Sequence, residues 1–462
     1  MRSAPNSSLR GASGGRPRRA QQGAATLIVV MVLFFIISLV AAYTSPNLIF
    51  EQRTANNPYR STQALEAAEA GLEWAISMLN QGRIDGACVA STNVADSSFR
   101  QRYLNVDDTG RIAPDPNPGG GELTPSCVFN GTGWTCSCPS TGTPSLTAPT
   151  AAGVWPAFKL RFQVIIPRDT TNPAIAKEPG LVRVQVVGCT RLDATTGDQC
   201  LTFSGQGATN EGRVVISSML GLSGGASSPP LAALTVRGQV NVTGGAPFAV
   251  YNTGAAGSGV TIQAGDAIIA TTPPTLVASP GSPGGMASAV QNDPALALPA
   301  AATFSSNDRM FAAVFNTRPE TMREQQAGIE LSGCPCSAAQ VRAAALLNPW
   351  RPIWVDGDLI GDSAGDIGSA ALPVLLVVNG NLQFTVTGVT VYGLVYNRLR
   401  TGITTWDTTG IATGQVIGAA VAENDLSGTG TPTFAYDADV IRLLRWNTGT
   451  FVRVPSSWKD YQ

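Results

Sequence analysis

The sequence predicts an α+β protein in which a long, kinked N-terminal helix lies on an antiparallel sheet and a β-rich C-terminal domain follows. Three observations lead to this prediction. An uncharged apolar run near the N-terminus continues into a helical stripe of apolar residues. Segments of alternating apolar and polar residues come next, as expected for half-buried strands. Beyond a Gly- and Ser-rich linker, the motif V-x-G-x-[VL] recurs among further strand-like segments.

The amino-acid composition limits the classes of function that the protein can have. The chain has 462 residues, which predicts two or three domains, and only 13% of them are charged. It contains no histidine, which excludes Ser-His-Asp and Cys-His nucleophile systems and HExxH zinc sites. The net charge of −1 gives no basic field, so we expect no nucleic-acid partner. No Gly-rich run has the pattern of a phosphate-binding loop, so we expect no enzyme activity and no cofactor.

The most informative stretch is Ala24–Tyr43, which reads AATLIVVMVLFFIISLVAAY. As a helix it would span about 30 Å, the thickness of a bilayer core. The preceding residues 1–23 carry five arginines and no acid, which predicts a cytoplasmic N-terminus. The alternative is a cleaved secretory signal, but the run exceeds the roughly 7–15 apolar residues of a signal peptide. We therefore expect a single membrane-spanning helix.

Helical periodicity continues outside this span as far as Leu79, so the sequence predicts one helix over residues 24–82. Pro46 and Pro58 each remove a backbone donor and should bend or break it. Asn80-Gln81-Gly82 is the predicted stop, with Gly82 in the left-handed conformation that ends many helices.

The N-terminal residues resemble a known family. A basic leader followed by Gln22-Gly23-Ala24-Ala25-Thr26-Leu27 is similar to the junction of type IV prepilins. The segments Glu51–Asn57 and Gln63–Leu72 resemble the N-terminal region of PilX-type minor pilins, and Phe451–Tyr461 resembles the end of such proteins. The resemblance implies that a prepilin peptidase removes the leader, residues 1–23, by cutting between Gly23 and Ala24. It also implies N-methylation of Ala24.

The resemblance implies a function in type IV pilus assembly or priming, with surface adhesion or twitching motility as further roles. The implied partners are other major and minor pilins, the prepilin peptidase, the inner-membrane assembly platform and a host or surface ligand. The protein would lie in the inner membrane before assembly and in the extracellular pilus afterwards. Ile28 stands at the fifth mature position, where major pilins carry glutamate, which favours a low-abundance subunit. A tip position is our hypothesis.

Two other functions stay open. One is a pseudopilin of type II secretion, since some of these also lack the glutamate at the fifth position. The other is a membrane-anchored cell-surface carbohydrate-binding protein, in which the helix is only an anchor.

The region 83–222 is predicted to be a head domain with strands at Trp155–Ile166, Leu181–Thr190 and Arg213–Leu222. In the first of these, Phe158, Leu160, Phe162 and Val164 alternate with Lys159, Arg161 and Gln163, which predicts one buried face. The outer half of the N-terminal helix is the element that would cover this face. The pilin fold implied by the resemblance agrees.

Eight cysteines on a translocated chain favour disulfides, and we expect Cys189 to pair with Cys200 across a polar loop. Cys88 and Cys127 are expected to close a long loop, with Cys136 or Cys138 as partners. The rival reading is a metal site, in which Cys136, Cys138, Cys334 and Cys336 supply four thiolates. The CxC spacing is shorter than that of usual zinc knuckles, so we expect no metal there.

Residues 223–230 are the predicted linker, and residues 231–462 the β-rich domain. The motif occurs at Val236–Val240, Val355–Leu359 and Val378–Leu382, and the last two copies are 23 residues apart. That step fits one coil of a β-helix or one hairpin pair, so a β-helix-like stack and a sandwich are the two alternatives. Ser306–Ala327 and Ser337–Leu347 are expected to be helical.

Four carboxylates gather in VDGDLIGDSAGD, and they are calcium candidates: Asp356, Asp358, Asp362 and Asp366. The match to a calcium loop fails at Ile360 and Ile367, and Asp is common in Gly-rich turns for conformational reasons alone. A second acidic spot is Glu423-Asn424-Asp425. Several aromatic side chains could stack on sugar or fill the core, namely Trp350, Trp354, Trp406, Trp446 and Trp458.

Overall fold

The structure is a computed structural model that describes residues 22–107, 109–115, 122–142, 146–149, 155–165, 179–192, 199–203, 211–242, 248–297, 308–399, 403–408 and 414–461. The chain divides after Tyr59 into two compact units. Residues 60–223 together with 450–461 are called the "head", because the last two strands pair with strands of the first segment. Residues 224–449, which lie between these segments in the sequence, are called the "insert".

The N-terminal helix α1 runs from Gln22 to Leu79 without interruption. Pro46 and Pro58 lie inside it, so neither proline breaks the helix. The expected left-handed end at Gly82 is wrong, because Gly82 is not among the residues with positive φ. This glycine is instead a point of close approach, where a Cβ atom would lie 2.6 Å from the carbonyl oxygen of Leu347.

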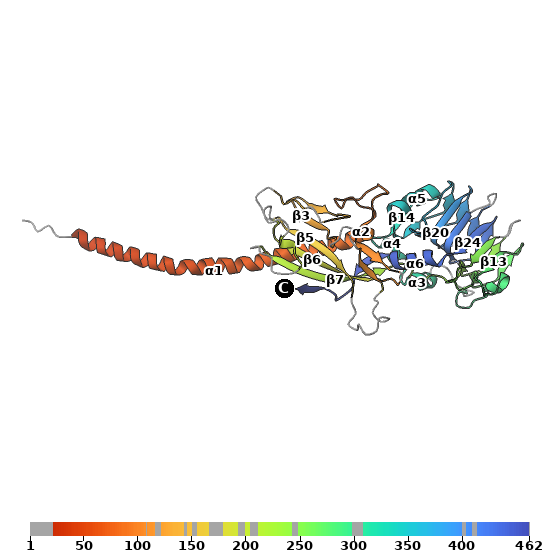
Figure 1. The fold of residues 1–462 in the computed structure, drawn as a ribbon, viewed down its shortest axis with the longest axis horizontal. Coiled ribbons are helices and arrows are strands. Elements are labelled where there is room, and N and C mark those ends of the chain that lie inside the picture. Colours follow the sequence, from red (N-terminus) through yellow and green to blue (C-terminus); the bar gives the residue numbers. More distant parts are fainter. Residues whose placement is uncertain are drawn as a thin grey trace, which may run out of the picture. The chain divides into compact units, whose positions relative to one another are not determined.

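The head contains an antiparallel sheet with the strand order β25-β7-β6-β5-β3-β4, and β26 also pairs with β7 (Figure 1). Its strands are β3 (Ser126–Phe129), β4 (Trp134–Ser137), β5 (Ala157–Gln163), β6 (Leu181–Cys189), β7 (Arg213–Ser223), β25 (Thr450–Arg453) and β26 (Lys459–Tyr461). Beside the sheet lie α2 (Phe99–Tyr103), the ribbon β1 (Leu104–Val106) and β2 (Ile112–Pro114), and a 3-10 turn η1 (Gln199–Leu201). The three strands predicted for this region are present.

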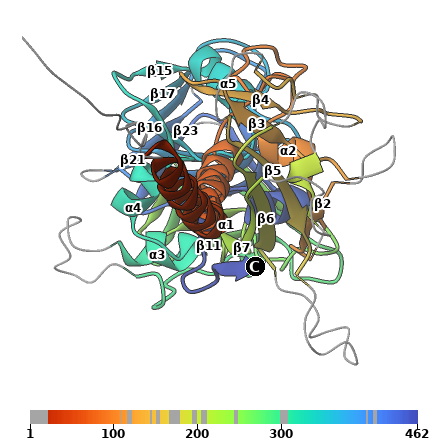
Figure 2. The same cartoon turned by 90° about the vertical axis from the view of Figure 1, so that its left-hand side faces the viewer.

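The part of α1 that belongs to the head covers one face of this sheet. Its buried stripe is Ala64, Ala68, Leu72, Ala75 and Leu79, and these side chains share one core with β5 and β6. The alternation predicted for β5 is observed, since Phe158, Leu160 and Phe162 are buried and their polar neighbours are half-exposed. Figure 2 looks along α1 and shows β5, β6 and β7 side by side.

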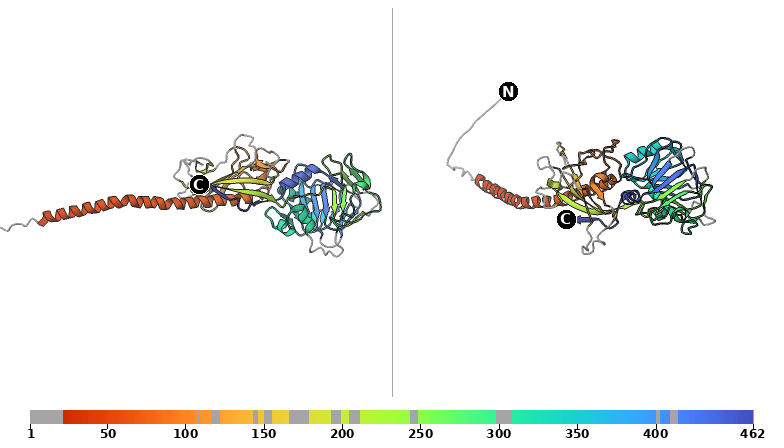
Figure 3. Two further views of the ribbon diagram at one scale, coloured as in Figure 1. Left: turned by 90° about the horizontal axis from the view of Figure 1, so that it is seen from below. Right: turned by 45° about the vertical axis from the view of Figure 1, so that its right-hand side comes forward.

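The last strands of the chain lie in the head. Thr450 pairs with Ser223 and Arg453 pairs with Leu220, so β25 is the antiparallel neighbour of β7. The chain between these two strands therefore leaves the head and returns to it at the same point of the sheet (Figure 3). The β-rich domain expected over 231–462 does not include its final strands, because β25 and β26 complete the head sheet instead.

The insert is built of strands that pair in parallel within two sheets. The first sheet follows the order β13-β10-β24-β22-β20-β18-β16-β14 and also holds β8 and β11, and the second follows β12-β9-β23-β21-β19-β17-β15. The strands are β8 (Leu234–Val236), β9 (Val240–Val242), β10 (Ala249–Asn252), β11 (Ile262–Ala264), β12 (Ile268–Ala270), β13 (Thr275–Ala278), β14 (Ile329–Leu331), β15 (Cys336–Ser337), β16 (Ile353–Val355), β17 (Leu359–Gly361), β18 (Val374–Val378), β19 (Leu382–Phe384), β20 (Val389–Asn397), β21 (Thr404–Asp407), β22 (Gly414–Ala422), β23 (Leu426–Thr429) and β24 (Pro432–Tyr436).

Each coil of the insert gives at least one strand to each sheet, and neighbouring coils pair in register; β10, β13 and β24 are additional strands of the first sheet. Val355 lies directly beside Val378, so the 23-residue step of the motif is one coil. The glycine of the motif lies at the corner between the two strands, as in β16–Gly357–β17. Of the two predicted arrangements, these parallel in-register pairs have the pattern of the β-helix-like stack rather than that of an antiparallel sandwich.

The coils do not stack in chain order. Five coils climb from β14–β15 to β22–β23, and the earliest coil in the sequence, β8–β9, then pairs with β22 and β23. The coil β11–β12 follows beyond it. The stack therefore closes at a seam, defined here as the contact of β22–β23 with β8–β9.

Helices cover the outer face of the first sheet near the head. They are α3 (Arg309–Phe315), α4 (Pro319–Glu324) and α6 (Ala438–Asn447). Helix α5 (Ala338–Leu347) follows β15 instead, and its Ala338 and Val341 are buried in the core that the two sheets share. A 3-10 turn, η2 (Gly285–Ser288), lies beside β13. Phe311 and Phe315 of α3 share a core with Trp354 and Tyr396 of the sheet. Both segments expected to be helical contain helices, although the first holds two short ones, α3 and α4.

Candidate functional site

The N-terminal part of α1 presents apolar side chains to its surroundings on every side. Thr26–Tyr43 is the one described helical span long and apolar enough to cross a membrane, and none of it is buried. Phe34 and Phe35 are 71% and 66% exposed, and Ile28 is 61% exposed. Apolar surface on all sides of a helix requires lipid or other helices around it, because water would hydrate it at a cost of about 25 cal/mol per Å².

The predicted processing site lies at the start of this helix. Gly23 and Ala24 belong to the first turn of α1, which begins at Gln22. Leader residues 1–21 lie outside the described part of the chain, and so does the side chain of Ala24. Cleavage after Gly23 and methylation of Ala24 therefore stay predictions.

Three helix C-termini converge where the head meets the insert, and two buried arginines bind their carbonyl groups. Arg100 donates to the carbonyl oxygens of Leu79, at the end of α1, and of Asn447, at the end of α6, both at 2.9 Å. Arg83 donates through Nε to the carbonyl of Leu346, near the end of α5, at 2.6 Å. The last carbonyls of a helix lack intrahelical donors and carry partial negative charge, so a guanidinium is a matched partner.

Arg100 is the centre of this junction. It is 5% exposed, also donates to the carbonyl of Gly449 at 3.0 Å, and lies over the Phe451 ring at 5.0 Å. Burial, and secondarily the charge of Arg351, lower the pKa of Arg100 to about 9. The guanidinium of Arg100 thus binds carbonyl groups of both the head and the insert, and these hydrogen bonds connect the two parts.

Two chain segments connect the head to the insert, and they are called the neck here: Ser223–Gly225 and Thr448–Gly449. A Cβ atom on Gly225 would lie 2.1 Å from the carbonyl oxygen of Thr448, and Gly449 has a φ of +133°. The two backbones thus touch, and only glycine fits at this crossing.

The cysteines form four disulfides. Cys189 pairs with Cys200, which is the pair the sequence favours. Cys88 pairs with Cys138, and Cys127 pairs with Cys136, which settles two pairings that the sequence left open. Cys334 pairs with Cys336. The four-thiolate metal reading is wrong for this structure, because Cys136 and Cys138 belong to different bridges and no cysteine is free.

The calcium candidates serve the coils of the insert. Asp356 accepts from Asn379 at 3.0 Å and pairs with Arg323 at 3.2 Å, while Asp358 accepts from the backbone of Asn381 at 2.7 Å. Asp362 accepts from the backbone of Ala338, and Arg342 binds the backbone carbonyl of Asp366. Among the described residues no three carboxylate or thiol groups converge as a metal site would require. These contacts are those expected of turn residues that fasten one coil to the next.

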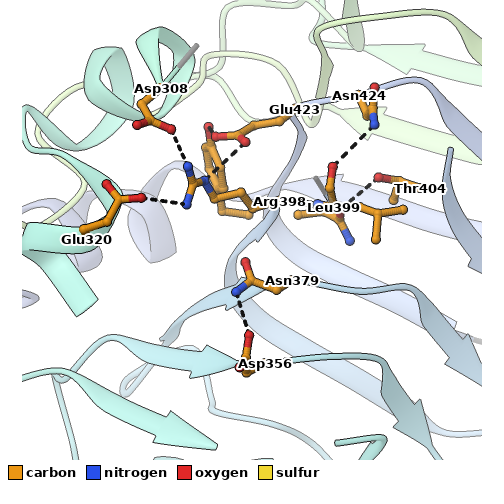
Figure 4. A network of polar contacts seen from close by, with 11 residues as sticks. Asp308, Glu320, Asp356, Asn379, Arg398, Leu399, Thr404, Glu423 and Asn424 are labelled. Carbon is orange, nitrogen blue, oxygen red and sulfur yellow. Dashed lines mark hydrogen bonds and ion pairs between the residues drawn. The ribbon is translucent and has the colours of Figure 1, made fainter. Parts of the chain in front are cut away.

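Glu423, from the second acidic spot, is buried directly after β22 and belongs to a network of polar contacts (Figure 4). Its carboxylate accepts from the Tyr396 hydroxyl at 2.7 Å and lies 3.4 Å from Nε of Arg398. Arg398 also contacts Asp308, which directly precedes α3, and Glu320, which belongs to α4. Burial raises the pKa of Glu423, although Arg398 opposes this effect. Asp425 meanwhile accepts from the backbone of Gln239, across the seam, at 2.8 Å.

The five tryptophans singled out in the sequence lie in three environments. Trp354 and Trp406 are core residues, 1% and 2% exposed. Trp458 is 42% exposed on the head. Trp350 and Trp446 line a partly open cavity of about 350 Å³ beside the junction.

Sequence reasoning missed the residues that join head and insert. Arg100 stands in FRQRYL and Asn80 in a predicted helix stop, and neither position is marked by a motif. Both bind backbone groups near the end of the chain, hundreds of residues away, which no local pattern identifies. Arg398 was also missed, because the carboxylates that it contacts lie on separate segments of the chain.

Comparison with known proteins gives one family. The family model described as "PilX N-terminal" matches residues 22–73. No curated protein matches. Among solved structures, the chain is similar to the competence-associated pilin ComZ from Thermus thermophilus, at 12% identity, over 87% of this chain and 97% of that chain. The TM-score of that superposition is 0.23, which is too low to support an argument about this chain.

The family match covers the helix that begins with an exposed apolar span and ends in the core of an antiparallel sheet. The match confirms the resemblance seen at the N-terminus, and the resemblance of Phe451–Tyr461 stays a prediction. Residues 22–73 are similar to the N-terminal segment of PilX-type pilins.

Proposed function

We propose that the protein is a minor pilin that takes part in assembly of a type IV pilus and carries its insert as a surface module. The observation that supports this best is the PilX-type segment at residues 22–73, inside one continuous helix from Gln22 to Leu79. The membrane stores the apolar span before assembly. On extraction, the helices of neighbouring pilins replace the lipid around Thr26–Tyr43.

The head and insert take different parts in this proposal. The head supplies the helix and sheet of a subunit, and its role is assembly rather than catalysis. The insert starts and ends at adjacent strands, so it can be added to a head without changing the order of the head's other strands. We place the precursor in the inner membrane with its N-terminus in the cytoplasm, and the mature subunit in the extracellular pilus.

Removal of the leader is the first step of the proposed function, and it can be tested by substitution. Replacing Gly23 with a bulky residue, Gly23→Leu, should leave the leader attached, whereas Gly11→Leu within the leader should be processed normally. N-terminal sequencing of the membrane-extracted protein measures both. If the Gly23→Leu protein still begins at Ala24, the proposed peptidase site is wrong.

A deletion strain tests the pilus role and separates it from secretion. Loss of the protein should reduce the number of pili or twitching motility, and the full-length chain should restore them. Pili of normal number and function in the deletion strain would contradict the proposal. Co-purification with the components of a type II secretion system, instead of those of the pilus, would assign the chain to the pseudopilins.

A further inference from the structure

The cavity beside the junction has features of a ligand site. It is lined by parts of both head and insert, including Asn105 and Asp115 from the head and Trp350 and Trp446 from the insert. Its volume of about 350 Å³ is within the range of small-molecule sites, which often lie where two parts of a protein meet.

Two polar side chains in this cavity lack partners. Asn105 is exposed and Asp115 is half-buried, and within the described chain neither side chain makes a hydrogen bond or an ion pair. Burial raises the pKa of the Asp115 carboxyl. A ligand with hydroxyl groups would supply the missing donors and acceptors.

The aromatic walls are held in fixed positions. Trp446 packs against Gly110, where an added Cβ would lie 2.4 Å from the ring, and the Arg445 guanidinium lies 4.5 Å from the ring centre. Trp446 is therefore a rigid side wall. Trp350 is half-buried, and its ring makes no contact with another aromatic ring of the described chain.

Trp350 also has an unusual backbone. Its φ is +65°, a left-handed conformation that is costly for a large side chain. The carbonyl of Trp350 accepts from Gly449 at 3.4 Å and from Arg100 at 3.5 Å, so the junction holds this conformation. Such strain is common where a side chain must be presented to a ligand.

Together these features match a neutral sugar. A sugar ring has apolar C–H faces that pack on an indole and a rim of hydroxyls that bond to amide and carboxylate groups. An anionic ligand fits less well, because Asp115 is inside the cavity and Arg100 already binds carbonyl groups of Leu79, Asn447 and Gly449.

We propose that the cavity binds one hexose or N-acetylhexosamine unit of a surface glycan, with Trp350 as the stacking platform and Asn105 and Asp115 as the hydroxyl partners. This inference deepens the proposed function, since it names the chemistry that a pilus-borne insert would recognise. Asp115 and Asn105 come from the head, so the site exists only when head and insert are joined.

Binding is measured with the full chain in a zwitterionic detergent without a sugar headgroup, because maltoside detergents would compete. Glucose, galactose, N-acetylglucosamine, N-acetylgalactosamine and N-acetylneuraminic acid are titrated by calorimetry and by tryptophan fluorescence. At least one neutral sugar should bind with a Kd of about 1 mM or tighter. Trp350→Ala and Asp115→Asn should each weaken it by about tenfold.

Matched controls separate a binding defect from a folding defect. Trp458→Ala removes an exposed tryptophan outside the cavity and should leave the Kd unchanged. Trp350→Phe keeps a ring in place and should retain most of the binding, and thermal unfolding of each variant verifies the fold. The proposal is overturned if no neutral sugar binds below about 10 mM, if the Trp350→Ala chain binds normally, or if the acidic sugar binds best.

This test is independent of pilus assembly. A folded Trp350→Phe or Asp115→Asn subunit should still be processed and restore pili in the deletion strain. Failure to bind sugar leaves the assembly proposal standing, and failure to restore pili by the wild-type chain leaves the binding result standing.

Discussion

The side-chain amide of Asn80 exchanges two hydrogen bonds with the backbone of Phe451, which is 371 positions later in the chain. Its Nδ2 donates to the carbonyl of Phe451 at 2.9 Å, and its Oδ1 accepts from the Phe451 N–H at 2.8 Å. Asn80, directly after α1, thus pairs with Phe451 as a residue of a neighbouring strand would, through its side-chain amide. The start of the head and the end of the chain are joined at this pair.

Removing this amide should destabilise the head. In Asn80→Ala both backbone groups of Phe451 lose their partner in a buried position, which costs about 1–3 kcal/mol in the free energy of unfolding. Gln81→Ala is the matched control, because Gln81 is adjacent and exposed. Denaturant unfolding measures both variants. Equal stability of the two would contradict the role given to Asn80.

The glycine crossing of the neck should tolerate no side chain. Gly225→Ala places a methyl group against the Thr448 carbonyl, so the two neck segments must separate, at a cost of about 1–3 kcal/mol. Gly254→Ala is the control, since a Cβ there meets nothing within 4 Å. Limited proteolysis should cut the Gly225→Ala chain at the neck and leave the control intact. The same cleavage pattern in both proteins would argue against a tight neck.

The head should fold without the insert. Ser223, the last residue of β7, pairs with Thr450, the first residue of β25. An Asn-Gly turn can therefore replace residues 224–449. The shortened chain should form the bridges Cys88–Cys138, Cys127–Cys136 and Cys189–Cys200, because they lie within the head. Disulfide mapping by mass spectrometry gives the readout. Scrambled bridges would show that the head depends on the insert to fold.

Glu423 should make stability depend on pH. Burial raises the pKa of Glu423 in the folded protein, so the folded state binds more protons than the unfolded state at pH values above the usual 4.5. The free energy of unfolding therefore falls as the pH rises from 4.5 toward the folded pKa. Glu423→Gln keeps an acceptor for Tyr396 and removes the titration, so its stability should fall less over this window.

Unfolding curves between about pH 4.5 and 7 compare the wild type, Glu423→Gln and Glu324→Gln. Glu324 is an exposed glutamate of the insert, so its replacement should preserve the wild-type slope. An unchanged slope in Glu423→Gln would mean that another group causes the dependence.

Periodicity predicted the parts of the fold that depend on local pattern. The stripe along α1, the alternation in β5 and the 23-residue step from Val355 to Val378 each follow from the repeat of a single element. The Cys189–Cys200 bridge was also accessible, because its two residues flank one short loop.

The order in which distant strands pair could not be predicted from local sequence patterns. The sequence gives no sign that the coil at Val236 stacks on the coil that ends at Thr429, or that Thr450 returns to Ser223. These contacts join segments far apart, and the backbone groups that form them have no sequence signature. The junction at Arg100 depends on this topology, so it could not be predicted either.

The order of strands in the head has a consequence for biogenesis. The sheet that α1 covers is incomplete until residues 450–461 have been synthesised, because β25 and β26 come after the insert in the sequence. A chain that ended within the insert would leave this edge of β7 without its partners. Under the proposed function, a subunit in which β25 pairs with β7 is therefore one whose insert has been synthesised in full.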